Sequence, residues 1–302
     1  MPEAKNTHQG PVIDRKNDFE VIECGQCNFR HVVPLPTENE LAALYNEDYY
    51  AREKPLYLER TKEDLSWWNL AYADRFAFFE ERLPQTRRRL LEVGSGPGYF
   101  LHMGQMRGWN GLGIEPSAQA AAHTREMGLE VLEDFLTPQT APALGTFDVV
   151  HMYNVLEHVP DPEQMIALAH SLLNPGGLYS VCVPNDYNVL QDVLRRFDDF
   201  EPWWVAPPHH LNYFSFDSLT ALLERSGFEV VERTTSFPME VFLLRGQNYI
   251  GNDALGRHCH GMRKLLDQRL EVSGLNHVRQ ELYRGLAALG IGREVELIAR
   301  RL

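Results

Sequence analysis

A strand that runs into a glycine-rich turn and then into a helix is the feature that most constrains this chain. Residues 90–100 read LLEVGSGPGYF, with Gly94, Gly96 and Gly98 between the strand and the helix. Glycines at these places let the chain turn tightly and bring bare backbone against a ligand, and the helix N-terminus offers unpaired N–H groups. Tyr99 stands where the third glycine of a dinucleotide-binding GxGxxG motif would be. The loop therefore predicts a bound ligand and argues against a nicotinamide dinucleotide.

The next strand ends in a carboxylate. Residues 111–117 read GLGIEPS, and Glu115 lies 21 residues after Gly94. A carboxylate at this strand end is placed to accept hydrogen bonds from both hydroxyls of a ribose. The glycine loop and Glu115 together predict a nucleoside-containing ligand.

Short apolar runs alternate with helical stretches from Arg89 onward, which is typical of βαβ units on a parallel sheet. Ser117 and Asp161 are placed to cap helix starts, and Gly176 and Gly227 to end helices. We expect a doubly wound α/β domain. Its strands are expected at 89–94, 111–115, 129–133, 147–153, 177–183, 228–235 and 294–300, and its helices at 98–107, 117–127, 161–173 and 216–226.

The segments before and within this domain suggest four parts of the chain. We expect an N-terminal accessory module, a linking helical cap, the α/β domain in two pieces, and a helical insertion that serves as a lid over the substrate. Their bounds are 1–48, 49–85, 86–238 with 292–302, and 239–291. The module includes an amphipathic segment that opens at Thr37. In the cap, 58–83 repeat apolar residues at helical spacing and predict one long helix that ends at Pro84.

The net charge and the lengths of the apolar runs limit the kinds of partner that the chain can bind. The 302 residues carry a formal net charge of −13, which repels phosphate backbones and anionic lipid surfaces. The first residues lack the basic and apolar pattern of a signal peptide, and no apolar run reaches the roughly 18 residues of a membrane span. We therefore expect a cytoplasmic protein with a small-molecule partner, reduced cysteines, no nucleic acid and no membrane contact. The oligomeric state stays open.

Four segments carry a family resemblance. EVGSGPG, the acidic residue after the second strand, FDVVHMYNVLEHVPDP and LLNPGGLYSVCVPN resemble the successive motifs of class I S-adenosylmethionine-dependent methyltransferases, in order and at the family's spacing. The resemblance covers about 86–238 and 292–302. It implies a mostly parallel, seven-stranded, Rossmann-like sheet whose final strand, REVELIARR, runs antiparallel.

The resemblance also implies the cofactor contacts. Glu92 and the glycine loop approach the methionine end of S-adenosylmethionine, Glu115 holds the ribose, and Asp134 with Phe135 contacts the adenine. The whole set expected to contact the cofactor is Glu92, Gly94, Ser95, Gly96, Gly98, Glu115, Pro116, Asp134, Phe135 and Asn154.

Residues after the fourth and fifth strands of the sheet are expected to face the methyl group, because ligands bind beyond the carboxyl ends of strands. His158 and His210 are the candidate bases, since imidazole titrates near neutrality, although His158 at a helix start is equally suited to packing and capping. HHLNYFS resembles the EHxxYFS segment of sugar C-methyltransferases, in which the histidine takes part in proton transfer, but His209 stands where that pattern has Glu. The candidate substrate contacts are Tyr153, Trp203, Trp204, His209 and Tyr213, of which the two tryptophans suit a hydrophobic lid or a core edge.

The N-terminal module contains a single CxxC pair, Cys24 and Cys27. With the aromatic residue after it, this pair resembles the second half of a zinc knuckle that precedes the catalytic domain in some bacterial methyltransferases acting on sugars and related metabolites. A structural zinc needs four N or S ligands, and the first CxxC pair is absent. His8, His31 or the HCH run at 258–260 are the donors available to complete a site; the alternative is a vestigial turn without metal. Zinc stays open, and a Cys₄ site is not expected.

The first functional hypothesis is methyl transfer from S-adenosylmethionine to an oxygen, or otherwise a carbon or nitrogen, of a small metabolite such as a sugar or a cell-surface polysaccharide precursor. A non-catalytic S-adenosylmethionine-binding regulatory protein is the alternative, and an NAD-dependent oxidoreductase is the third. The histidines and aromatic residues of 203–214 favour an enzyme, because a sensor has no need of proton-transfer groups.

Overall fold

A twisted sheet forms the centre of the computed structural model, which describes residues 8–36 and 57–302. Within these residues the sheet has seven strands in the order β10-β11-β8-β7-β4-β5-β6. Their bounds are β4 Arg89–Val93, β5 Asn110–Ile114, β6 Glu130–Leu132, β7 Phe147–Tyr153, β8 Leu173–Pro184, β10 Phe228–Thr234 and β11 Glu294–Arg301. β4 pairs in parallel with β5 and β7, whereas β11 is antiparallel to β8 and β10. The doubly wound sheet and its reversed last strand are confirmed.

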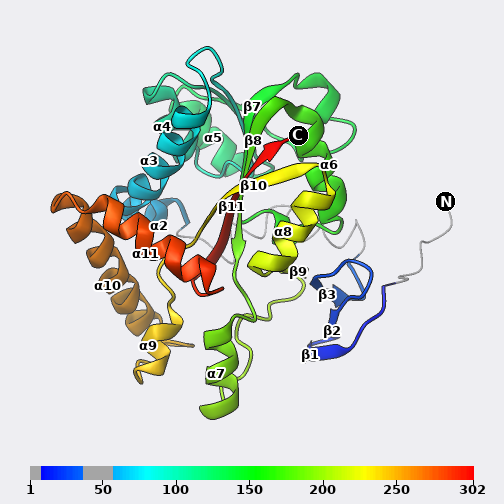
Figure 1. Cartoon of the computed structure of the whole chain (residues 1–302), viewed down its shortest axis with the longest axis vertical. Helices are drawn as coiled ribbons and strands as arrows, with labels where there is room; N and C mark the ends of the chain where they lie inside the picture. Colours follow the sequence, from blue (N-terminus) through cyan, green and yellow to red (C-terminus); the bar gives the residue numbers. More distant parts are fainter. Residues whose placement is uncertain (1–7, 37–56) are drawn as a thin grey trace.

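Helices cover both faces of the sheet, so its central strands are buried and mostly apolar. Leu90, Leu91, Val149 and Val150 are fully buried, which is the pattern of parallel strands covered on both sides. In Figure 1, α3 (Leu65–Arg82), α4 (Tyr99–Met106) and α5 (Ala118–Glu126) lie on one side, and α6 (Pro162–Leu172) and α8 (Phe216–Arg225) on the other. Ser117 and Asp161 cap α5 and α6 through their side chains, as expected.

The single helix expected over 58–83 is wrong. The chain forms α2 (Tyr57–Glu63) and α3, with Asp64 between them. Asp64 does not cap α3 with its side chain; it accepts hydrogen bonds from Lys264 and His260 of the insertion, which tie the junction between the two helices to α10. α3 ends at Arg82, with Leu83 extended before Pro84.

The insertion before the last strand is helical, as expected. It consists of α9 (Glu240–Leu244), α10 (Asp253–Val272) and α11 (Asn276–Ala288). α10 packs against α3, α11 packs against β10, and α9 packs against α7 (Val189–Phe197). None of the helices that the structure describes has both the length and the apolar character needed to cross a membrane.

The N-terminal module is built into the rest of the chain. β1 (Val12–Lys16), β2 (Phe19–Glu23) and β3 (Arg30–Val33) form an antiparallel sheet whose fourth strand is β9 (Asn212–Tyr213). Figure 1 shows this sheet beside α8, away from the insertion. The small sheet therefore extends beyond the 1–48 boundary. The amphipathic segment that opens at Thr37 lies outside the described residues.

Candidate active site

The glycine loop has a conformation that requires its glycines. Gly94, Gly96 and Gly98 have φ values of 70°, 51° and 79°, which side chains strongly disfavour. A Cβ atom at Gly98 would lie 2.7 Å from the Thr124 hydroxyl oxygen. The N–H of Gly94 donates to the carbonyl of Ile114 at 2.8 Å, so the loop is fastened to the end of β5. This edge of the sheet presents bare backbone, as the sequence predicts.

Glu115 joins the glycine loop to the start of α5. Its Oε2 accepts from the Gly96 N–H at 2.8 Å and its Oε1 from the Ser117 N–H at 2.9 Å. Only 2% of the residue is exposed. Burial raises the pKa of this carboxyl group, and the two backbone donors oppose that rise. Each oxygen retains a lone pair for a further donor, so the carboxylate is positioned to accept from a diol held against the loop.

Two buried polar atoms beside the loop have no hydrogen-bond partner among the described residues: Oε2 of Glu92 and the hydroxyl of Ser95. Burial, and then the charge of Glu115, raises the pKa of Glu92 well above its ordinary value, against the opposing charge of Arg75. Unsatisfied buried groups are rare in folded proteins and often mark a place where another molecule binds. The donor and acceptor set fits a ligand with an ammonium group and a ribose.

The other predicted cofactor residues lie at the same edge. Asp134 and Phe135 follow β6 and are exposed, and the Phe135 N–H donates to Asp134 Oδ1 at 2.7 Å. Asn154 follows β7 in a left-handed conformation with φ of 53°, and Pro116 directly follows Glu115. The carboxyl ends of β4 to β7 thus gather these residues, which is where open α/β sheets bind ligands. Their contact with the cofactor stays a prediction.

The two candidate bases lie against each other. The rings of His158 and His210 are in edge contact, with centroids 5.0 Å apart. Nδ1 of His210 lies 3.9 Å from Asp186 Oδ2, and Nε2 of His158 lies 3.6 Å from Glu157 Oε1. Burial lowers the pKa of His210, but Asp186 and Glu157 outweigh it and Arg293 opposes them, so the net direction is upward. Asp186, after β8, provides the carboxylate that position 209 lacks.

The segment around His210 is held on two sides. Leu211 N–H donates to the carbonyl of Glu157 at 2.8 Å, and the Asn212 side chain donates to the carbonyls of Leu156 and Val159 at 3.2 and 2.7 Å. These contacts fix the segment to the short helix Leu156–His158. Its other side pairs with β3. His210 therefore lies beside His158 because hydrogen bonds on one side and the pairing with β3 on the other hold this segment in place.

Trp204 and Tyr213 belong to the core of the small sheet. They pack with Val21, Val32 and Leu211, and the Tyr213 hydroxyl donates to the His210 carbonyl at 3.2 Å. From the sequence we expect the two tryptophans in a hydrophobic lid or at a core edge. Trp204 is buried in this core. Contact of Trp203, Trp204, His209 or Tyr213 with a substrate stays a prediction, and for the two buried residues it requires the segment to open.

A cavity of about 220 Å³ lies between α3, the ends of β10 and β11, and the helices α10 and α11. Tyr153, at the end of β7, is part of its wall, and Trp68 meets this tyrosine edge to face at 5.6 Å. The insertion closes one side of this cavity, because α10 packs against α3 and both α10 and α11 contribute to the wall. The role of the insertion as a lid over the substrate stays a prediction.

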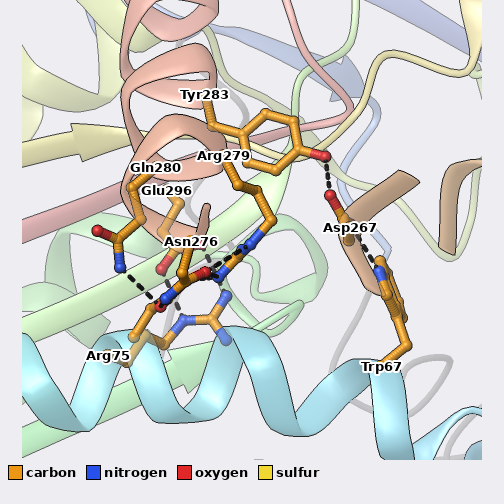
Figure 2. Close-up of polar contacts among 9 residues, drawn as sticks. Trp67, Arg75, Asp267, Asn276, Arg279, Gln280, Tyr283 and Glu296 are labelled. Atoms are coloured by element: carbon orange, nitrogen blue, oxygen red, sulfur yellow. Dashed lines mark hydrogen bonds and ion pairs between the residues drawn. The ribbon is translucent and has the colours of Figure 1, made fainter. Parts of the chain in front are cut away.

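Buried polar contacts hold the walls of this cavity (Figure 2). Arg75 of α3 forms two hydrogen bonds to the carboxylate of Glu296, at 2.6 and 2.7 Å. Asp267 of α10 accepts from Trp67 Nε1 at 2.7 Å and from the Tyr283 hydroxyl. Sequence reasoning missed Arg75, Asp267 and Glu296, because charged residues along a helix or a strand resemble a solvated face.

The comparisons with known proteins agree with this geometry. Residues 65–233 match the methyltransferase domain family. The ubiquinone biosynthesis O-methyltransferase of Pseudomonas aeruginosa (strain UCBPP-PA14) is 36% identical over 109 residues, 34% of this chain and 47% of that protein. The protein of the same name from Actinobacillus pleuropneumoniae serotype 7 (strain AP76) is 37% identical over 172 residues, 50% of this chain and 73% of that protein.

The chain thus spans about half the length of the Pseudomonas relative. Among solved structures, magnesium protoporphyrin IX methyltransferase from Synechocystis PCC 6803, determined with bound SAH, is similar with a TM-score of 0.51 at 12% identity. The match covers 88% of this chain and 100% of that chain, and it shows a shared fold. The chain belongs to the class I S-adenosylmethionine-dependent methyltransferase family.

Proposed function

We propose that the protein transfers a methyl group from S-adenosylmethionine to an oxygen of a small metabolite. The observation that carries this proposal is Glu115, whose carboxylate is fixed against the glycine loop at the end of β5. Both relatives described above are named O-methyltransferases, which supports oxygen as the acceptor atom. A hydroxylated acceptor such as a sugar is the first class to test.

The residues of the site divide the work between binding and proton transfer. The cofactor, when bound, supplies a methyl group already activated on a sulfonium. Glu115 accepts hydrogen bonds from the ribose, and Glu92 with Ser95 offers buried polar atoms toward the methionine end. His210 or His158 accepts the proton that the acceptor hydroxyl loses. Alignment of reacting groups is worth about 7–11 kcal/mol in favourable cases, whereas a general base contributes a factor of about 10²–10⁴. Loss of the base should therefore weaken activity without abolishing it.

The cavity has room for a small acceptor. Neither His158 nor His210 lines it, so the acceptor has to extend beyond the cavity for either ring to reach the reacting hydroxyl. Its volume of about 220 Å³ is below the roughly 300–1,000 Å³ of pockets for drug-sized ligands. Tyr153, Thr235 and Glu294 bring the carboxyl edge of the sheet into its wall. Polar side chains line it along with aromatic ones, which suits a hydroxylated metabolite.

The test is incubation of the whole chain with S-adenosylmethionine labelled on the methyl group and fractionated metabolites, followed by identification of the labelled product. We expect label on an oxygen of a small molecule, and much less with a Glu115→Ala variant at a cofactor concentration below saturation. Label on a carbon or nitrogen would show that oxygen is not the acceptor atom. Cofactor binding without turnover of any fraction would favour the regulatory alternative, and binding of NAD in place of S-adenosylhomocysteine would overturn the proposal.

A further inference from the structure

Four side chains of the N-terminal module converge on one point, away from the methyltransferase site. They are His8, Cys24, Cys27 and His31, and one potential ligand atom from each lies within 4.8 Å of all the others. Nδ1 of His8 is 3.1 Å from the Cys27 sulfur and 3.5 Å from the Cys24 sulfur. The rings of His8 and His31 meet edge to face with centroids 4.9 Å apart.

The two distances from His8 are close to those of ligands around a small tetrahedral ion. Zn–S bonds of about 2.3 Å and Zn–N bonds of about 2.0–2.1 Å at a tetrahedral angle place sulfur and nitrogen about 3.5–3.6 Å apart. The His8 to Cys24 distance has this value, and the His8 to Cys27 distance is shorter by a few tenths of an ångström. With every ligand atom within 4.8 Å of the others, the four side chains are near enough to enclose an ion once they move inward.

His31 gives an independent indication of a ligand. Only 2% of the residue is exposed, and its Nε2 has no hydrogen-bond partner among the described residues. Its Nδ1 lies 2.9 Å from the Val32 carbonyl. Because a carbonyl only accepts, Nδ1 carries the proton, and the Nε2 lone pair is buried without a donor. A backbone carbonyl on one ring nitrogen and a metal on the other is the usual arrangement of a metal-binding histidine.

The backbone of the CxxC turn is shaped as a chelating loop. The Cys27 N–H points at the Cys24 sulfur at 3.5 Å, and the Asn28 N–H donates to the Cys24 carbonyl at 3.0 Å. Asn28 has a left-handed conformation with φ of 59°, which turns the chain so that both sulfurs face the same side. An N–H directed at a sulfur stabilises a thiolate. Both cysteines are buried and free.

We propose that His8, Cys24, Cys27 and His31 bind one structural Zn²⁺ ion in a Cys₂His₂ site. Two thiolates and two imidazoles are the ligand types that zinc prefers, and four protein ligands close the coordination sphere, which is the mark of a structural site. The HCH run at 258–260 takes no part, since His260 binds Asp64 and Cys259 is buried in α10.

The proposed ion ties three segments together. His8 precedes β1, the two cysteines lie in the turn between β2 and β3, and His31 lies in β3 opposite Asn212 of β9. Asn212 is the residue whose side chain holds the carbonyls of Leu156 and Val159. The site therefore supports the segment that carries His210 through the pairing of His31 with Asn212. None of the four ligands is itself His210 or His158.

The test is the zinc content of the purified whole chain, measured by elemental analysis after reconstitution with Zn²⁺ and removal of excess metal. We expect about one zinc per chain, and less than about a tenth of that in the double variant Cys24→Ser/Cys27→Ser. His31→Asn and His8→Asn should each weaken zinc binding severalfold in competition with a chelator. Cys259→Ser and His258→Asn are the matched controls and should keep the metal.

A second measurement covers variants that fail to fold. The unmodified chain, stripped of metal and titrated with Co²⁺, should give the intense visible bands of tetrahedral cobalt with thiolate charge transfer, saturating at one ion per chain. Sub-stoichiometric metal in the reconstituted unmodified chain, an unchanged zinc affinity of both histidine variants in the chelator competition, or a Cys24–Cys27 disulfide found by mass spectrometry would each overturn the proposal. None of these readouts depends on methyl transfer, so failure here leaves the proposed function standing.

Discussion

Nδ1 of His158 lies 2.7 Å from the carbonyl oxygen of His209. A carbonyl accepts and never donates, so this contact places a proton on Nδ1 and leaves the lone pair of the neutral ring on Nε2. The partner histidine, His210, has its Nδ1 directed toward Asp186. The two rings in contact thus have different electrostatic surroundings, and they should respond differently to substitution.

The pH dependence of turnover should identify the base. The pKa of His210 is raised above its ordinary 6.5 because Asp186 and Glu157 favour the charged ring more than burial and Arg293 disfavour it. Only the neutral ring accepts a proton, so kcat/KM, which reports the free enzyme, should rise with pH through a midpoint above 6.5 and then level off. Asp186→Asn removes a carboxylate and should move the midpoint to lower pH. The measurement is kcat/KM against pH for both proteins.

His210→Asn should lower kcat by about 10²–10⁴ with little change in cofactor affinity. His158→Asn tests the competing assignment, and His277→Asn, at an exposed position of α11, is the matched control. Full turnover in both the His210 and His158 variants would show that neither histidine acts as a general base. Catalysis would then rest on the alignment of the reacting groups.

Glu115→Ala should weaken binding of S-adenosylhomocysteine by about 1.5–3 kcal/mol, the scale of hydrogen bonds to a charged group. The Gly96 N–H also loses its acceptor, so the loop should become less ordered. Glu115→Gln keeps one acceptor oxygen, so its affinity for S-adenosylhomocysteine should lie between those of the unmodified chain and Glu115→Ala. Calorimetric titration measures this, with Glu133→Ala as a control because Glu133 pairs with Arg125 on the surface. Unchanged affinity would remove Glu115 from the ribose role.

Asp267→Ala should raise the KM for the acceptor and leave the affinity for S-adenosylhomocysteine unchanged. Asp267 is 3% exposed and holds both Trp67 and Tyr283, so its loss leaves two buried donors unpaired and loosens the cavity wall. Asp253→Ala, at the exposed start of α10, is the control. Steady-state kinetics with varied acceptor decides this, and an unchanged KM would move the acceptor out of the cavity.

Breaking the pair between Arg75 and Glu296 should destabilise the fold. Both residues are buried, with 4% and 8% of their surface exposed, and removing one partner of a buried ion pair costs about 3–5 kcal/mol because the other charge is left uncompensated. Arg75→Met and Glu296→Gln should each lower the urea midpoint strongly. The double variant should lose less than the sum of the two, and strict additivity of the unfolding free energies would contradict the pairing.

The fold could be predicted from sequence because periodicity and glycine placement carry it. Strand runs such as 147–153 are mostly apolar, and Ser117 and Asp161 mark helix starts with their own side chains. Helix α7 was not foreseen, although Asn188 and Gln191 form a reciprocal capping box there. Its apolar residues recur at helical spacing in VLQDVLRRF, so the pattern was present in the sequence and was missed.

The site residues could be predicted only where a residue of the right chemical type lies at a characteristic distance along the sequence from a recognisable motif. Glu115 lies at a fixed distance from the glycine loop, whereas Asp186 reaches His210 and Asp267 reaches Trp67 only through tertiary packing. The break at Asp64 has the same origin, since its partners Lys264 and His260 are distant in sequence. Long-range pairing of charged side chains leaves no local pattern.

The pairing of β3 with β9 has a consequence for the order in which the chain is made. β1, β2 and β3 leave the ribosome early, but β9 follows β3 by about 180 residues. Until it arrives, one edge of β3 exposes unpaired N–H and C=O groups, and such an edge is a template for pairing with another nascent chain. The small sheet thus passes through an aggregation-prone interval during synthesis, and β9 ends it only once five strands of the central sheet have already emerged.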